Sequence, residues 1–449
     1  MEKKVKVIGA GLAGSEAAIY LANKGYKVEL VEMRPKYTTG AHKTSYPAEF
    51  VCSNSLGALD ILSASGLLKE EAIKLGSTLF KIAKECAVPS GNSLSIDRFG
   101  FSKKIEEIIN SNPNITLINE KYEKLDFSTP TIIATGPLSA KELALSIKET
   151  FGEEEFHFYD AIAPIVEKNS IDFNKAFYAS RWDKGEADFI NCPMTKEEYE
   201  NFYDILINAE RAPLKEFEAS YFEGCMPVEV MAARGKDTLR FGPMKPVGLF
   251  DRRIETEFKK HQFYAVVQLR QDDKLADLYN LVGFQTNLKW GEQKKLINAI
   301  PGLENANIVR YGVMHANTFI NSPKILNKHL QTKKYENLFF AGQLTGVEGY
   351  SESISTGLFA AINMDRFLQN KKMLTLTNST MLGALIDYIT FPDHKKFQPV
   401  NSNWGIVKEI SIEEFDGSKK KLKDKTFKNT IRSNRALKEI ENIIKELDN

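Results

Sequence analysis

The sequence predicts an α/β protein in which a Rossmann-like dinucleotide-binding domain carries an α+β insertion domain. A strand, a glycine-rich turn and a helix follow one another at the start of the chain, and the same order recurs near residues 131 and 337. Short strand-like and helical pieces fill the stretch between the second and third units. Since a domain takes roughly 100 to 200 residues, the 449 residues allow two or three domains.

We expect four segments along the chain. Residues 1–150 form the first part of the cofactor-binding domain, 151–304 the α+β insertion domain, and 305–370 the second part of the cofactor-binding domain. Residues 371–449 form a C-terminal segment with a basic tail.

The first unit is a β-turn-α-β arrangement. Residues 4–8 are rich in β-branched side chains, residues 15–23 place alanine and leucine on one helical face, and residues 26–33 form a second strand. The turn between strand and helix contains the candidate cofactor-binding residues Gly9, Ala10, Gly11, Leu12, Ala13 and Gly14.

The glycine spacing is typical of a turn that binds a dinucleotide. Gly9-x-Gly11-x-x-Gly14 lets the backbone approach a pyrophosphate and directs the N-terminus of the next helix toward its charge. Glu32, 18 residues after Gly14, is placed to hold a ribose. The alternative is that the glycines only allow close packing of helix and strand.

The second and third units repeat the pattern. Residues 131–134 form a strand that leads into a helix, with Ser139 as its cap and Glu142 completing a capping box. Residues 337–341 form another strand, followed by a glycine-rich turn and a helix over about 353–368. We expect the three strands to share one sheet.

Composition excludes several classes of protein. Hydrophobic residues make up 43% and charged residues 27% of the chain, which is typical of globular proteins, and 60 basic against 59 acidic side chains leave a net charge of +1. No apolar run reaches the roughly 18 residues of a membrane helix. The four cysteines are far apart, and no Cys/His cluster suggests a metal site, so we expect reduced thiols, no metal and a cytoplasmic location.

Two cysteines are candidates for chemistry. Cys225 lies between Gly224 and Pro227 in a tight loop, which favours a nucleophile if a positive charge lowers its pKa. Cys52 is followed by polar residues, and an inert core thiol is an equal alternative there. Cys86 and Cys192 are expected to be packing residues.

Other polar features are less specific. His42 and His315 lie in polar stretches and either line a site or are ordinary histidines. Residues 250–263 are expected to form an exposed charged loop. Residues 419–435 contain eight basic side chains against Asp424, a net of +7, which favours either RNA phosphate binding or a solvated helix face.

Taken together, these residues resemble the folate- and FAD-dependent tRNA uracil-C5 methyltransferases (TrmFO) over nearly the whole chain. The similar stretches are Gly9–Gly14 with Glu32-Met-Arg-Pro35, Ala48-Glu-Phe-Val-Cys-Ser-Asn-Ser-Leu56, Ile133–Pro137, Asn191–Met194, Phe222-Glu-Gly-Cys-Met-Pro227, Phe241–Gly248, Gln268-Leu-Arg-Gln-Asp272 and Gly342–Tyr350. A related family of wobble-uridine flavoproteins lacks the two cysteine motifs and is much longer.

The resemblance implies an FAD-binding domain of glutathione-reductase type and a methylenetetrahydrofolate--tRNA-(uracil-5-)-methyltransferase (NAD(P)H-oxidizing). By this likeness, 5,10-methylenetetrahydrofolate donates a one-carbon unit to the uridine at position 54 of the tRNA T-loop, with FAD as cofactor and NAD(P)H as reductant. It also implies that Cys225 attacks uracil C6 and Cys52 removes the C5 proton, or the reverse. The turn residues expected near the flavin are Gly342, Gln343, Gly346 and Gly349.

Three positions depart from the family pattern. Gly57 and Ala316 stand where arginine is usual, and Lys43 stands where histidine is common. Because guanidinium groups often anchor phosphates and carboxylates, these departures leave open a 23S ribosomal RNA uridine as the target. An RNA-binding flavoprotein that does not methylate and a flavin oxidoreductase acting on a small molecule are the alternatives of another class.

Overall fold

The computed structural model describes residues 4–39, 41–152, 156–161, 163–183, 186–213, 226–254, 263–394, 397–411, 414 and 424–447. For residues 156–161, 315 and 316 it describes the backbone alone.

A five-stranded parallel sheet organises the first core. Its strands are β1 (Lys4–Ile8), β2 (Lys27–Glu32), β6 (Ile115–Asn119), β7 (Thr131–Ile133) and β16 (Leu338–Phe340). They lie in the order β16-β7-β1-β2-β6, and every neighbouring pair is parallel. The three strand-turn-helix units therefore share one sheet, as the sequence predicts. The strands that follow β1 are added first on one side of it (β2, β6) and then on the other (β7, β16), so the strand order switches between β1 and β7, the place where such sheets form a ligand crevice.

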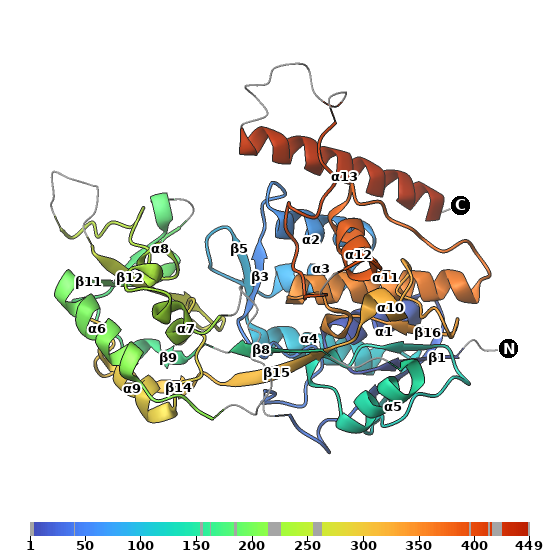
Figure 1. Cartoon of the computed structure of the whole chain (residues 1–449), viewed down its shortest axis with the longest axis horizontal. Coiled ribbons are helices and arrows are strands. Elements are labelled where there is room, and N and C mark those ends of the chain that lie inside the picture. The colour runs from blue at the N-terminus through green and yellow to red at the C-terminus, as the bar shows by residue number, and fades with distance from the viewer. Residues whose placement is uncertain are drawn as a thin grey trace.

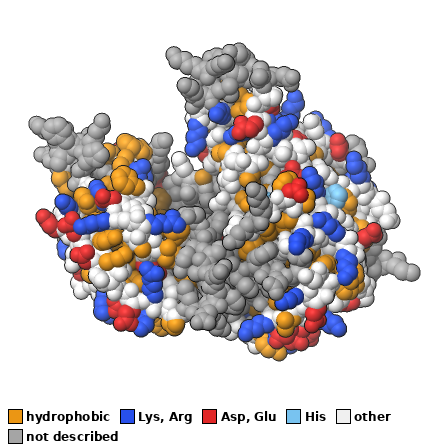
Figure 2. All heavy atoms as spheres, viewed as in Figure 1, with side chains coloured by type: hydrophobic (Ala, Val, Ile, Leu, Met, Phe, Trp, Pro, Cys, Tyr) orange, Lys and Arg blue, Asp and Glu red, His pale blue; other side chains and the backbone are white. Residues whose placement is uncertain are grey.

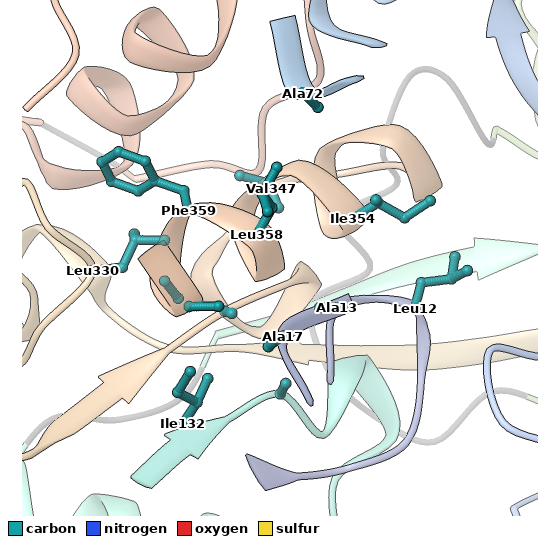
Figure 3. Packing of buried hydrophobic residues seen from close by; sticks show 14 of the residues in the cluster. Leu12, Ala13, Ala17, Ala72, Ile132, Leu330, Val347, Ile354, Leu358 and Phe359 are labelled. Carbon is teal, nitrogen blue, oxygen red and sulfur yellow. The ribbon is translucent and has the colours of Figure 1, made fainter. Parts of the chain in front are cut away.

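Two helices that are far apart in the sequence pack together over this sheet. They are α1 (Leu12–Asn23) and α11 (Tyr350–Leu368), and Figure 3 shows Ala13 and Ala17 of α1 facing the side of α11 that carries Ile354 and Leu358. A Cβ on Gly357 would lie 2.3 Å from the Ala13 carbonyl oxygen, so the close approach of the two backbones requires glycine there. This contact fixes the start of α11 beside the glycine loop.

The remaining elements of the first core surround this layer. They are the strands β3 (Ser55–Ala58), β4 (Ala87–Val88) and β5 (Ser93–Ile96) and the helices α2 (Ala64–Lys74), α3 (Leu79–Glu85), α4 (Arg98–Ser111), α5 (Lys141–Phe151) and α10 (Ser322–Ile325). Two buried glutamates fix helix ends among them. Glu16 accepts hydrogen bonds from the backbone nitrogens of Thr78 and Leu79 at the start of α3, and Glu71 does the same for Met381 and Leu382.

The insertion has a second core built on an antiparallel sheet. Its strand order is β10 (Phe177–Ala179), β11 (Phe189–Met194), β12 (Ala265–Gln271), β13 (Leu278–Leu281), β9 (Ile165–Glu167) and β14 (Ile308–Arg310). The helices are α6 (Lys196–Asn208), α7 (Val228–Ala233), α8 (Thr238–Phe241) and α9 (Trp290–Asn298). The expected α+β mixture is confirmed, and a capping box of Thr195 and Glu198 starts α6.

The two cores form two lobes, seen at the left and right of Figure 1. The antiparallel strands β8 (Phe156–Ala161) and β15 (Met314–Phe319) run between them, so the chain leaves the first lobe through one strand and returns through the other. We propose to keep the four segments expected from the sequence, with the insertion extended beyond residue 304, because β14 belongs to its sheet.

The C-terminal segment packs on the first core. Its helices are α12 (Met381–Thr390) and α13 (Lys425–Leu447), the long helix at the top of Figure 1. Asn429 and Ser433 of α13 donate hydrogen bonds to the backbone oxygens of Leu62 and Ile61, next to α2. Ala436, Ile440 and Ile443 are buried in the same contact.

One expected helix start is wrong. A 3-10 turn over Gly136–Leu138 precedes α5, whose N-cap is Ala140 without a side-chain hydrogen bond. Ser139 instead donates to the Gly136 carbonyl, and Glu142 pairs with Lys121. Pro137 lies in the 3-10 turn. The hydroxyl of Ser139 is hydrogen-bonded to this turn and therefore does not cap the α-helix that follows.

Candidate functional site

The glycine loop has the geometry of a dinucleotide cradle. Gly9 has φ +97°, and a Cβ there would lie 2.6 Å from the Ala134 carbonyl oxygen. A Cβ on Gly14 would lie 1.8 Å from the Gly9 oxygen, whereas one on Gly11 would have no atom within 4 Å. Gly9 and Gly14 are therefore required by packing, and Gly11 is the glycine that faces open space.

Glu32 lies at the end of β2, beside this loop. Its Oε2 accepts a hydrogen bond of 2.8 Å from the Ala10 nitrogen, and its Oε1 accepts one of 2.8 Å from Arg34 Nε. Burial opposes ionisation of this carboxyl, but the hydrogen bond and charge of Arg34 outweigh it and lower the pKa of Glu32. The side chain is thus a carboxylate at the crevice.

Two adjoining cavities extend from the loop. The first is lined by Gly9, Gly11, Glu32 and Tyr122 among others. The second is lined by Leu12, Gly342, Gln343 and Tyr350 among others. Residues that line both are Gly11, His42, Thr135 and Leu138. Together the cavities offer an extended site with the glycine loop at its middle.

These residues fit FAD. Gly11 is the N-cap of α1 and has no side chain to bond the first N–H groups of the helix, so these groups are available to a pyrophosphate. The cavity beside Glu32 suits the adenosine end, and the cavity between Leu12 and Tyr350 suits the flavin end.

The four turn residues expected near the flavin have different surroundings. Gly342 and Gln343 line the second cavity. Gly346 lies under Phe397, whose ring would be 2.5 Å from a Cβ there, and Gly349 lines a different cavity with Ser53 and Glu348.

Cys52 lies in a loop that contacts several distant elements. Its backbone nitrogen donates a hydrogen bond of 2.6 Å to the Tyr350 hydroxyl, and its carbonyl oxygen accepts one of 2.9 Å from Arg98. Arg310 donates to the carbonyl oxygen of Val51 at 2.5 Å. Because Tyr350 and Val51 also line the second cavity, this loop borders the space assigned to the flavin.

Arginines gather around Cys52. Burial lowers the pKa of Arg270 to about 10, and it also lowers the pKa of Arg310. Burial also acts to lower the pKa of Arg98, but the charge and hydrogen bond of Asp272 have the larger effect, so the pKa of Arg98 is raised. The sequence alone missed these four residues, although Arg270 and Asp272 lie in one of the motifs that carry the family resemblance.

Cys225 lies outside the described residues, as does the side chain of His315. The residue after Cys225, Met226, is buried, and Pro227 caps the start of α7. Cys192 is fully buried in β11, and burial raises its pKa; Cys86 is partly buried, and its pKa is also raised chiefly by burial. Both have the environment of packing residues.

Gly57 has a structural context of its own. Its φ is +79°, and a Cβ there would lie 2.6 Å from Ser65 Oγ, so a side chain at this position would be strained and crowded. Lys69, which the sequence did not single out, lies buried nearby and donates to the Leu56 carbonyl at 2.7 Å. Burial lowers the pKa of Lys69 to about 8.

The basic tail is only partly available to RNA. Residues 415–423 lie outside the described part of the chain, and so do residues 255–262 of the expected charged loop. Arg435 pairs with Glu414 at 3.1 Å, and the guanidinium of Arg432 lies over the Trp404 ring at 5.8 Å. Of the eight basic residues, Arg432 and Arg435 therefore dock α13 on the chain that precedes it, and neither alternative expected for the tail describes these two arginines.

Charge and metal ligands give no further site. On the face in Figure 2, acidic and basic side chains are interspersed. Among the described residues, no group of three or more His, Cys, Asp and Glu side chains is placed to hold a metal ion. Within the same residues, no helix combines the length and apolarity needed to cross a bilayer.

Comparison with known proteins places the chain in a family. The model of the family "Glucose inhibited division protein A" matches residues 4–372. A Bacillus cytotoxicus protein named methylenetetrahydrofolate--tRNA-(uracil-5-)-methyltransferase TrmFO is 53% identical over 441 residues, covering 98% of both chains. Its namesake from Bacillus licheniformis is 52% identical over 448 residues, covering 100% of both.

A solved structure agrees with the fold. Aquifex aeolicus GidA matches with a TM-score of 0.68 at 16% identity, covering 100% of this chain and 76% of its own. At this identity the likeness supports the architecture alone. The family model and the two full-length relatives together show that the chain belongs to the TrmFO family, within the wider glucose inhibited division protein A family.

Proposed function

We propose that this chain transfers a one-carbon unit from 5,10-methylenetetrahydrofolate to C5 of a uridine in RNA, with bound FAD and with NAD(P)H as reductant. The names of its full-length relatives support tRNA as the substrate. The observation that carries the proposal is the placement of the Cys52 loop, which the Tyr350 hydroxyl holds at the edge of the proposed flavin cavity.

The chemistry requires two groups that handle covalent and proton transfer. Uracil C5 is a poor nucleophile until a thiolate adds to C6, and the C5 proton must leave afterwards. We assign the addition to Cys225 and the proton removal to Cys52. FAD, held by the glycine loop and Glu32, would supply the electrons that the transfer requires.

The described residues have distinct parts in this scheme. The glycine loop and Glu32 hold the dinucleotide, Gly342 and Gln343 orient its ring end, and Tyr350 fixes the backbone of Cys52. The guanidinium groups of Arg98, Arg270 and Arg310 favour negative charge at the thiol of Cys52. Such an enzyme would work in the cytoplasm, where thiols stay reduced.

A ribosomal RNA uridine is the second candidate target. The left-handed backbone of Gly57 and the nearby Ser65 hydroxyl disfavour a side chain at this position. Gly57 and Ala316 carry no charged side chain, so neither can anchor a phosphate of the tRNA as an arginine would. An RNA-binding flavoprotein without methylation remains the alternative of another class.

A transfer assay tests the proposal. Purified protein, NADPH and labelled methylenetetrahydrofolate are incubated separately with unmodified tRNA and with 23S ribosomal RNA transcripts. Label at C5 of a tRNA uridine supports the first candidate, and label only in ribosomal RNA supports the second. FAD-loaded protein that labels neither RNA would refute methyl transfer.

A further inference from the structure

The loop around Cys52 lies at the junction of the two lobes and is bonded to both. Asn54 is fully buried, and its Nδ2 donates to the carbonyl oxygen of Ile96 in the first lobe and of Gln271 in the insertion, both at 2.9 Å. Asn280 of the insertion donates to Asn54 Oδ1 at 3.2 Å. The loop's position is therefore set by contacts from both lobes.

Arg98 makes the second link between the lobes. It is the first residue of α4, and its Nη1 donates to the carbonyl oxygens of Phe50 and Cys52 at 3.0 and 2.9 Å. Its Nη2 bonds Asp272 Oδ1 at 2.5 Å, across the junction. Asp272 is 3% exposed and also accepts a hydrogen bond from Asn280 at 3.1 Å. One carboxylate thus orients the guanidinium that holds the backbone of Cys52.

The charges at this junction are unbalanced. Arg98, Arg270 and Arg310 come from α4, β12 and β14, and each interacts electrostatically with Cys52. Asp272 is the carboxylate that interacts with all three. Within the described part of the chain, the buried Nε atoms of the three arginines have no hydrogen-bond partner. The Cys52 thiol therefore lies in a positive field that Asp272 moderates.

We propose that Asp272 is a positioning residue for Cys52, which acts through Arg98 to hold the thiol-bearing loop and limits the positive field of the three arginines. The inference deepens the proposed function, because it rests on the assignment of Cys52 to proton removal. An ion pair that only joined the two lobes would have no specific effect on the ionisation of the thiol.

Charge substitutions separate these two roles. Asp272→Asn keeps the shape and an acceptor for Arg98 but removes the negative charge, so the thiolate should form at lower pH. Arg270→Gln removes one positive charge, so the thiolate should form at higher pH. Because the two substitutions remove charges of opposite sign near the thiol, we expect shifts of opposite sign, each of at least about 0.5 pH unit.

The measurement is the pH dependence of iodoacetamide labelling at Cys52 in the full-length protein, read by mass spectrometry of its peptide. The Cys86 peptide of the same sample is an internal reference, because the charged groups that act on this thiol are Lys104, Asp97, Glu85 and Lys274. Asp277→Asn removes an exposed carboxylate near Asp272 and is the matched control. It should leave the labelling midpoint of Cys52 unchanged.

Arg98→Lys gives an independent test of positioning. Lysine keeps the charge but replaces the planar fork, in which Nη1 holds two carbonyl oxygens and Nη2 holds Asp272, with a single nitrogen of different reach. The plateau labelling rate should therefore change severalfold with little shift in midpoint. The proposal would be overturned if the labelling midpoints of Asp272→Asn and Arg270→Gln both stayed at the wild-type value or moved in the same direction. If Asp272→Asn does not fold, an unshifted labelling midpoint in Arg270→Gln alone would overturn the proposal.

Labelling needs neither folate nor RNA. A chain with the expected shifts but no methyl transfer would therefore refute the proposed function alone. A chain that methylates RNA without these shifts would refute this inference alone.

Discussion

The backbone nitrogen of Cys52 and the hydroxyl of Tyr350 form a hydrogen bond of 2.6 Å although the residues are 298 positions apart. Tyr350 is the first residue of α11, whose place against α1 is fixed by the close approach at Gly357. The packing that forms the cofactor crevice therefore also positions the candidate catalytic thiol.

Replacing Gly11 with valine should give a folded protein without flavin. The Cβ meets no protein atom within 4 Å, so the added methyl groups enter the space where the pyrophosphate must lie. We expect the flavin absorbance per protein to fall at least tenfold, with a melting temperature close to that of flavin-free wild type. Gly291→Val, in α9 and equally uncrowded, should stay yellow. A Gly11→Val protein with full flavin absorbance would contradict the assignment of the loop.

RNA that carries 5-fluorouridine at the target position should form a denaturation-stable adduct with the protein, because fluorine does not leave as the proton does. Cys225→Ala should abolish the adduct, and Cys52→Ala should retain it. The adduct is measured as a shifted band on a denaturing gel. The opposite pattern would exchange the two cysteine roles.

Glu71 should make stability depend on pH. Burial raises the pKa of Glu71 from 4.5 to about 8, so the folded chain keeps a proton that the unfolded chain releases above pH 4.5. The stability from this proton is present in full below pH 4.5 and is lost as the pH rises toward 8. The advantage of wild type over Glu71→Gln in unfolding free energy should therefore fall by about 2 to 4 kcal/mol between pH 5 and 8.

Urea unfolding at several pH values measures this difference. Glu70→Gln removes the adjacent carboxyl group of the same helix and serves as the control, with a difference from wild type that stays nearly constant. A constant difference for Glu71→Gln as well would show that Glu71 is ionised in the folded protein.

The basic residues before α13 should bind RNA without choosing the uridine. Neutralising Lys419, Lys420, Lys421 and Lys423 should weaken binding to target and non-target RNA alike. Each lost phosphate contact should flatten the plot of log affinity against log salt by about 0.7 to 0.9. Filter binding at several salt concentrations measures it, and an unchanged slope would mean that this segment only aids solubility.

Arg435→Gln is the informative comparison for that experiment. Its guanidinium pairs with Glu414 and donates to the Lys408 carbonyl, so its loss should loosen α13 from the chain before it. We expect a lower melting temperature and a nearly unchanged salt slope.

The local parts of this molecule were predictable and the long-range ones were not. The strand, glycine turn and helix around Gly9 follow from a few adjacent residues, and the recurrence of that order correctly predicted one sheet. By contrast, Arg98 meets Asp272 across 174 positions, and no periodicity or motif marks such a pair. The same holds for Lys69, which looks like an ordinary lysine in a polar helix.

Two sequence expectations failed because the charge of a residue and its tendency to cap helices do not specify which partner it meets in the folded protein. Arg435 appeared as one of eight cations, but tertiary structure placed Glu414 beside it. Ser139 has the chemistry of a helix cap, but the 3-10 turn at Gly136 took its hydrogen bond. Neither outcome is visible in the segment itself.

Mapping of 5-methyluridine tests the central claim most directly. Total tRNA and ribosomal RNA from cells with and without this protein are digested, and the modified uridine is located by mass spectrometry. Our account predicts one 5-methyluridine that disappears with the protein and returns with wild type but not with Cys225→Ala, in the tRNA T-loop for the first candidate. Identical 5-methyluridine maps in both RNA classes, with and without the protein, would contradict it.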